Sequence, residues 1–278
     1  MIAAAAGSAL VAGSCIFAGP ALLLRGDWRW RRPRAALLTW MAMLLGGCLV
    51  LLVGLVALLA AAVARPHHGP LETTAIFVGG WAALVVAGAL AALVAAQAEP
   101  VLGASRRARW QVELLAARSR QRTRVAGVEV VTVDSDAPVA AGCRGHTGDR
   151  VVLSTPVQRA LGAEGLRAVV EHERAHLQQR HGLILRLAQV NVACFPALPS
   201  ARRLDREARV LTELAADDVA ASRCGAGAVA RALRAVDAVR PETGLALRAH
   251  RVEALAAPDR RRFARRAVPA PLGVRGRR

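Results

Sequence analysis

The stretch EHERAHLQQRH, residues 171–181, holds a His-Glu-x-x-His pattern in a chain with seven histidines. On a helix, His172 and His176 lie one turn apart on the same face, so both imidazoles can bind one metal ion. Glu173 lies beside the first histidine, where its carboxylate can take a proton from a metal-bound water. Zinc lowers the pKa of that water, which then attacks a peptide carbonyl. The pattern indicates a zinc peptidase, although a solvated helix with His and Glu at this spacing also produces it.

A catalytic zinc site needs a third protein ligand and an open position for water. The downstream stretch ELAAD, residues 213–217, supplies Glu213 as the candidate ligand on a second predicted helix. Asp217 lies one turn later, where it can accept a hydrogen bond from a ligand imidazole and fix its tautomer. The alternative is an acidic cluster on a solvated helix, but the apolar neighbours of both residues favour a packed face.

Short strands and helices are predicted around these residues. Alternation of β-branched and turn residues predicts strands at 128–133 and 150–154, with a loop tip between them. A short helix begins after a cap at Ser154 or Thr155, and a longer helix spans 163–181 and is ended by Gly182. Two amphipathic helical patterns follow over 201–239.

The N-terminal part of the chain predicts membrane spans. The hydrophobic fraction is 54% and the mean hydropathy is +0.34, which are high values for a soluble protein. Three apolar runs without charge cover about 2–24, 35–64 and 73–98, and each exceeds the roughly 20 residues that cross a bilayer. We expect a transmembrane region over 1–98, a cytoplasmic domain over 99–257, and a disordered basic tail over 258–278.

The distribution of arginine predicts the orientation of these spans. The loop 25–34 holds five Arg and the segment 105–124 holds seven, whereas the loop 65–72 holds one. By the positive-inside rule, the two Arg-rich segments are cytoplasmic and the N-terminus is outside.

The segment 183–199 is apolar enough to suggest a fourth span, but Arg186 and two prolines interrupt it. If it crossed the bilayer once, Glu213 would lie on the opposite side from the two histidines. Three ligands must meet within about 2.0–2.2 Å of one ion, so that arrangement is impossible for the zinc site. We therefore expect a membrane-associated helix that returns to the cytoplasm.

The stretch 171–181, followed by RRLDREARVLTELAADDVAA at 202–221, resembles the membrane zinc metallopeptidases of the BlaR/MecR type. These are similar to the HtpX and CAAX prenyl protease (Ste24-like) group, and the resemblance covers roughly 125–225. Arg174 departs from it, because this position is often apolar in these families. The stretch APVAAGCRGHTGDRVVLS, residues 137–154, also looks like the hairpin that precedes the helix in such enzymes, where a strand of this kind would line the cleft and pair with the substrate backbone.

This resemblance implies one Zn²⁺ per chain in a zincin-like, mostly helical peptidase domain with a small β-hairpin. It implies zinc binding by His172, His176 and Glu213, general base catalysis by Glu173, and support of a ligand imidazole by Asp217. His250 and Arg251 are candidate donors to the oxyanion of the tetrahedral intermediate, with a surface helix as the alternative. His181 is expected to cap carbonyl groups at the end of its helix.

Other classes of function fit the composition less well. All 38 basic residues are Arg, which indicates a coding bias rather than a nucleic-acid surface. Aromatic residues make up 3%, so surfaces on which bases could stack are lacking. The five cysteines form no C-x-x-C pair, so a disulfide framework or a Cys-based zinc site is not expected.

The sequence thus predicts a mainly α integral membrane protein with three N-terminal transmembrane helices followed by the metallopeptidase domain. It is expected in the plasma membrane, with its active site in the cytoplasm, a protein or peptide substrate, the lipid bilayer as partner, and no nucleic acid. A candidate role is regulatory proteolysis of a cytoplasmic repressor or a membrane protein. The alternative is a catalytically silent membrane protein that keeps the peptidase fold for signalling or partner binding.

Overall fold

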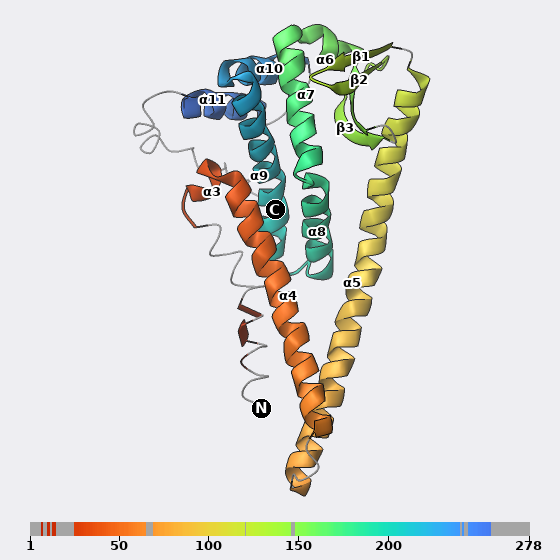
Figure 1. Ribbon diagram of the computed structural model, residues 1–278, viewed down its shortest axis with the longest axis vertical. Coiled ribbons are helices and arrows are strands. Elements are labelled where there is room, and N and C mark those ends of the chain that lie inside the picture. The colour runs from red at the N-terminus through yellow and green to blue at the C-terminus, as the bar shows by residue number, and fades with distance from the viewer. Residues whose placement is uncertain are drawn as a thin grey trace, which may run out of the picture. The chain divides into compact units, whose positions relative to one another are not determined.

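The computed structural model describes residues 7, 10–11, 13–14, 25–64, 69–119, 121–145, 148–239, 241 and 244–256, which are mostly helical with one small sheet (Figure 1). The predicted first span, about 2–24, lies almost wholly outside the described residues, and the tail 258–278 lies wholly outside them. Contacts divide the chain into two units, Met1–Leu115 with His176–Ala216, and Ala116–Ala175 with Asp217–Arg278. Each unit is described by itself below.

Two long apolar helices dominate the first unit. Helix α4 is Pro33–Ala64 and helix α5 is Pro70–Arg118. By length and composition, their stretches Pro33–Ala57 and Phe77–Arg118 could cross a membrane, and only 11% and 6% of their most apolar windows are buried. A core helix of a soluble protein would be mostly buried, so the exposure favours membrane association. Within the described ranges, these two candidate spans overlap the second and third predicted spans, and the first predicted span is not tested because it lies almost wholly outside those ranges.

The first unit also contains a helical hairpin. Helix α8, His181–Cys194, is followed by α9, Pro199–Cys224, so the chain reverses direction within a few residues. At 14 residues, α8 is shorter than the roughly 20 that span a bilayer. Its association with the membrane stays a prediction.

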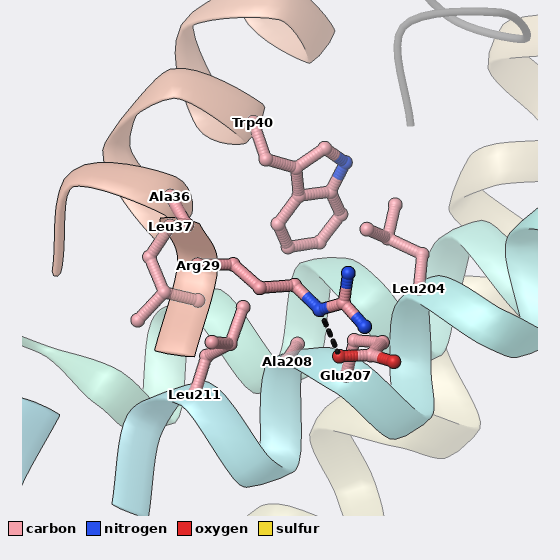
Figure 2. Close-up of a pocket in the computed structure, with 8 residues that line it drawn as sticks. All are labelled: Arg29, Ala36, Leu37, Trp40, Leu204, Glu207, Ala208 and Leu211. Carbon is pink, nitrogen blue, oxygen red and sulfur yellow. Dashed lines mark ion pairs between the residues drawn. The ribbon is translucent and has the colours of Figure 1, made fainter. Parts of the chain in front are cut away.

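The start of α4 packs on α8 and α9 through buried apolar side chains. Trp40 is 3% exposed and joins Leu204 of α9 and Ile184 of α8 in one cluster. Arg29, from the short helix α3 (Trp28–Arg31), forms an ion pair with Glu207 at 3.2 Å beside this cluster (Figure 2). The first half of α9 is therefore held by residues of α3 and of the first turns of α4.

The second unit contains a four-stranded sheet in the order β1-β2-β4-β3. The strands are β1 Gln121–Val125, β2 Val128–Val133, β3 Ala140–Gly145 and β4 Gly148–Ser154. The strand predicted at 128–133 is confirmed, and the one at 150–154 is found as β4. These two strands pair with each other in parallel. The hairpin that the sequence suggested within residues 137–154 is found as β3 and β4, which form an antiparallel pair.

Local backbone chemistry explains two boundaries of this sheet. Ala126 and Gly127 both have positive φ, 49° and 79°, which is the requirement of a tight type I′ turn between β1 and β2. Ser154 precedes α6, Thr155–Ala160, as predicted, but its hydroxyl makes no cap hydrogen bond. It accepts a hydrogen bond from the backbone N–H of Val139 at 2.9 Å instead, so it fixes the segment before β3.

The sheet packs against helices in the core of the second unit. Side chains of β2 and β4 join α6, α7 (Ala163–Gln178), α10 (Ala226–Val239) and α11 (Leu245–Ala256) in one cluster. Helices α10 and α11 also pack on each other (Figure 1). This core holds one face of α7, the helix that carries the His-Glu-x-x-His pattern.

We predict that Leu153→Ala destabilises the second unit strongly. Leu153 is 0% exposed in the cluster of sheet and helices, so the substitution should cost about 2–5 kcal/mol of unfolding free energy. Leu247→Ala is the matched control, since this leucine is 63% exposed on α11 and should cost less than about 0.5 kcal/mol. Thermal unfolding in detergent, followed by circular dichroism, measures both. Equal losses would contradict this account of the core.

Candidate metal centre

Helix α7 carries His172, Glu173 and His176, and helix α9 carries Glu213 and Asp217. Each helix is continuous across the division between the units. In the second unit, Nδ1 of His172 lies 3.0 Å from Oδ1 of Asp217. In the first unit, Nε2 of His176 lies 3.5 Å from Oε1 of Glu213.

The side chains of His172, His176 and Glu213 converge, and one ligand atom from each lies within 4.8 Å of the others. Tetrahedral zinc at 2.0–2.2 Å from its ligands sets ligand atoms about 3.3–3.5 Å apart. The 3.5 Å between His176 and Glu213 meets that spacing. Because Asp217 faces Nδ1 of His172, this imidazole would bind a metal through Nε2. Two imidazole nitrogens and one carboxylate oxygen form a donor set that fits zinc with one position open.

Asp217 is fully buried, with 0% of its side chain exposed. Its carboxylate accepts two hydrogen bonds from Arg248 at 2.8 Å each, besides the contact with His172. Burial alone would raise the pKa of Asp217, but the hydrogen bonds from Arg248 and His172 outweigh it and hold the pKa well below its usual range. An ionised Asp217 can accept a hydrogen from Nδ1 of His172.

Sequence reasoning missed Arg248 and instead singled out its neighbours His250 and Arg251. Arg251 donates to Asp218 at 2.8 and 3.2 Å, and His250 is exposed on α11. A donor role toward the oxyanion for either residue stays a prediction. The signal that could have found Arg248 is the buried acid itself, since a desolvated carboxylate needs a cation or several donors.

Glu173 is held by the sheet. Its Oε2 accepts a hydrogen bond from the backbone N–H of Gly142 at 2.8 Å. Gly142 belongs to β3, which is an edge strand, and this N–H points to Glu173 rather than to β4. The carboxylate predicted to act as base therefore lies at the outer edge of β3.

The sequence suggested that His181 caps carbonyl groups at the end of the helix that carries the His-Glu-x-x-His pattern. Helix α7 ends earlier than predicted, so His181 lies outside it. The helix stops at Gln178, and Arg180 takes a left-handed conformation with φ 54° before α8 begins. Gly182, the expected terminator, lies inside α8. His181 is 1% exposed, and its Nδ1 lies 3.0 Å from Nδ1 of His176.

Glu171 is a further buried acid that sequence reasoning passed over. It is 4% exposed, and Arg223 of α9 donates to it at 2.5 Å. Arg174, the residue that departs from the family pattern, lies 3.6 Å from the same carboxylate. An arginine at this position therefore has a structural partner in this chain.

The sequence model of peptidase family M48 matches residues 103–216, a stretch that contains the His-Glu-x-x-His pattern and Glu213. The match supports an M48 metallopeptidase, a family of zinc-dependent enzymes. Comparisons with the curated proteins and with the solved structures give no match.

We predict that Arg248→Met costs about 3–5 kcal/mol of unfolding free energy, because it leaves the buried Asp217 without its cation. Arg251→Met is the matched control, with an expected loss of about 1 kcal/mol or less, because its partner Asp218 is 36% exposed. Thermal unfolding in detergent compares the two. A similar loss in both variants would refute the buried-charge account.

The pKa of Asp217 is depressed in the folded protein. Its contribution to the free energy of unfolding is therefore complete above about pH 4 and is lost as the pH falls further.

Proposed function

We propose that the chain is a membrane-embedded zinc endopeptidase whose active site comprises His172, Glu173, His176 and Glu213. The observation that carries the proposal is the convergence of two imidazoles and a carboxylate on adjacent turns, with Glu173 next to the first histidine. The match to peptidase family M48 over 103–216 supports it. Within that family we favour a relationship to the BlaR/MecR-type and HtpX-like membrane enzymes, because the His-Glu-x-x-His and Glu-x-x-x-Asp motifs follow apolar helices.

In this proposal, His172 and His176 bind the ion through Nε2, and Glu213 is the third ligand. When bound, zinc supplies Lewis acidity that activates a water and polarises the scissile carbonyl. Glu173 accepts the proton of the attacking water and later delivers it to the leaving amine nitrogen. The hydrogen bond from Gly142 orients this carboxylate, and Asp217 keeps His172 in the tautomer that binds metal.

The edge strand β3 supports an endopeptidase. The N–H of Gly142 points away from β4 and toward Glu173, so the outer edge of β3 borders the proposed base. An extended peptide can add to such an edge through backbone hydrogen bonds, which select conformation rather than a chain end. A substrate strand on β3 would therefore have its backbone next to the catalytic carboxylate.

The ion pair between Arg29 and Glu207 supports a cytoplasmic active site. Arg29 lies in the Arg-rich loop before α4, and Glu207 lies on α9 less than two turns from Glu213 (Figure 2). A contact at 3.2 Å requires both to lie on the same side of a membrane. If α4 and α5 each cross the membrane once, the chain after α5 returns to the side on which Arg29 lies. The positive-inside rule assigns that side to the cytoplasm.

We propose accordingly a plasma-membrane location, with the N-terminus outside and α8 associated with the inner face. The substrate would be a cytoplasmic repressor or a membrane protein that reaches this face. The second candidate, a catalytically silent relative, is less favoured because Glu173 is present and is oriented by a backbone donor.

We predict opposite metal behaviour for two substitutions of glutamate. Glu173→Gln should keep about one zinc per chain and lose about 10²–10⁴-fold of peptidase activity, because only the base is removed. Glu213→Ala should lose zinc together with activity, because it removes a ligand. Metal analysis and casein cleavage by the purified protein measure both effects. Glu253→Gln, an exposed acid paired with Arg234, is the control. Full zinc in Glu213→Ala would exclude this ligand, and activity that survives Glu173→Gln would exclude the mechanism.

The proposed topology predicts which positions react with a membrane-impermeant maleimide on intact cells. In the full chain with its five cysteines replaced by alanine, Gly69→Cys between α4 and α5 should be labelled from outside. Leu247→Cys on α11 should be labelled only after the cells are permeabilised, although this position is 63% exposed. The reverse pattern would invert the assigned orientation.

A further inference from the structure

His181 forms a chain of contacts that ends at a proposed metal ligand. Its Nδ1 lies 3.0 Å from Nδ1 of His176, and its Nε2 lies 3.2 Å from Oε1 of Gln179. The two imidazole rings are perpendicular, at 89°, with centroids 4.7 Å apart. The other nitrogen of His176 faces Glu213 at 3.5 Å, so His176 lies between Glu213 and His181.

These contacts permit one arrangement of hydrogens if His176 binds metal through Nε2. A neutral imidazole carries one hydrogen, and a ligand nitrogen must be free of it. His176 therefore carries its hydrogen on Nδ1 and donates it to His181. His181 must then accept at Nδ1 and carry its own hydrogen on Nε2, which faces the amide oxygen of Gln179. Each donor in the chain meets an acceptor.

We propose that His181 is a positioning residue that fixes the tautomer and ring orientation of His176, and that Gln179 fixes the tautomer of His181. The inference rests on the proposed zinc site and extends it. His181 is 1% exposed, so no bulk water competes for its Nδ1. Its Nδ1 and Nε2 contact His176 and Gln179, and among the described residues the converging ligand atoms belong to His172, His176 and Glu213, which separates this role from that of a fourth ligand.

The backbone explains why His181 can reach this position. The left-handed residue Arg180 ends α7 abruptly, so the first residue of α8 folds back beside the last turn of α7. A regular helix would place residues five positions apart on different faces, about 140° apart around the axis. The break after Gln178 is thus required for the contact between the two histidines.

Two substitutions at the same position test the proposal. His181→Leu removes the acceptor and keeps a side chain of comparable bulk, whereas His181→Asn retains an oxygen acceptor near the place of Nδ1. We expect zinc affinity, measured by competition with a chelator, to fall about 10–100-fold in His181→Leu and to return to within about threefold of wild type in His181→Asn. The visible d–d absorption of the Co²⁺-loaded protein should change in the leucine variant and be restored in the asparagine variant.

Controls separate a positioning role from a general loss of structure. Leu183→Ala, on the exposed first turn of α8, should bind zinc as the wild type does. Gln179→Leu should weaken zinc binding less than His181→Leu, because it acts through one more contact. Far-ultraviolet circular dichroism of the metal-free variants should match that of the wild type.

The outcomes are distinguishable from those of the proposed function. If the wild type itself binds no zinc, the proposed function fails and this inference fails with it. If the wild type binds zinc and His181→Leu binds it equally well, the inference alone is overturned. Equal weakening in His181→Leu and His181→Asn would also overturn it, because a shared acceptor would then have no effect.

Discussion

The carboxylate of Asp217 is the constraint on which the rest of the site depends. It is withdrawn from water completely, and an isolated charge in that position would be very costly. Arg248 offsets this cost with two hydrogen bonds, and His172 adds a third contact. Since the three residues come from α9, α11 and α7, the charge can be satisfied only when these helices have packed. A buried pair of this kind adds little net stability, so its value lies in fixing the geometry.

The two histidines on α7 are oriented by chemically different acceptors. His172 faces an ionised carboxylate, whereas His176 faces the imidazole of His181. A carboxylate raises the electron density of the imidazole that it accepts from, and a neutral ring does so less. The difference between the acceptors follows from the turn at Arg180, which provides His181 in place of an acid.

The sequence indicated which side chains come together better than it indicated the residues that hold them in place. His172, Glu173 and His176 follow from spacing on one helix, and the pairing with Glu213 and Asp217 follows from a second helix with the same period. Strand β2 was predicted at its observed bounds because its valines give a strong local signal. Strand β1 was missed and β3 was expected only as part of the hairpin within residues 137–154, because Arg alternates along β1 and β3 consists mostly of Ala and Gly, which give a weak local signal for a strand.

The same reasoning explains why Arg248 and His181 escaped prediction. Arg248 is one of 38 arginines, and nothing in its local pattern separates it from solvated ones. His181 depends on a left-handed arginine, a conformation that sequence patterns assign to glycine, and Gly182 offered an obvious but incorrect helix end. Both residues contact partners that are not at the i, i+3 or i+4 spacing of a helix. Such contacts become visible only when the backbone is known.

Helix α9 shows how one element can serve two kinds of surroundings. In the first unit, Leu204, Ala208, Leu211 and Ala215 form a stripe at helical spacing that packs on α4 and α8. In the second unit, Ala220 of the same helix joins the core of the sheet. Glu213 and Asp217 lie on the segment between the two ends, on another face. The helix that carries Glu213 is therefore packed at its first turns against Trp40 of α4, and its Glu207 is paired with Arg29 of α3.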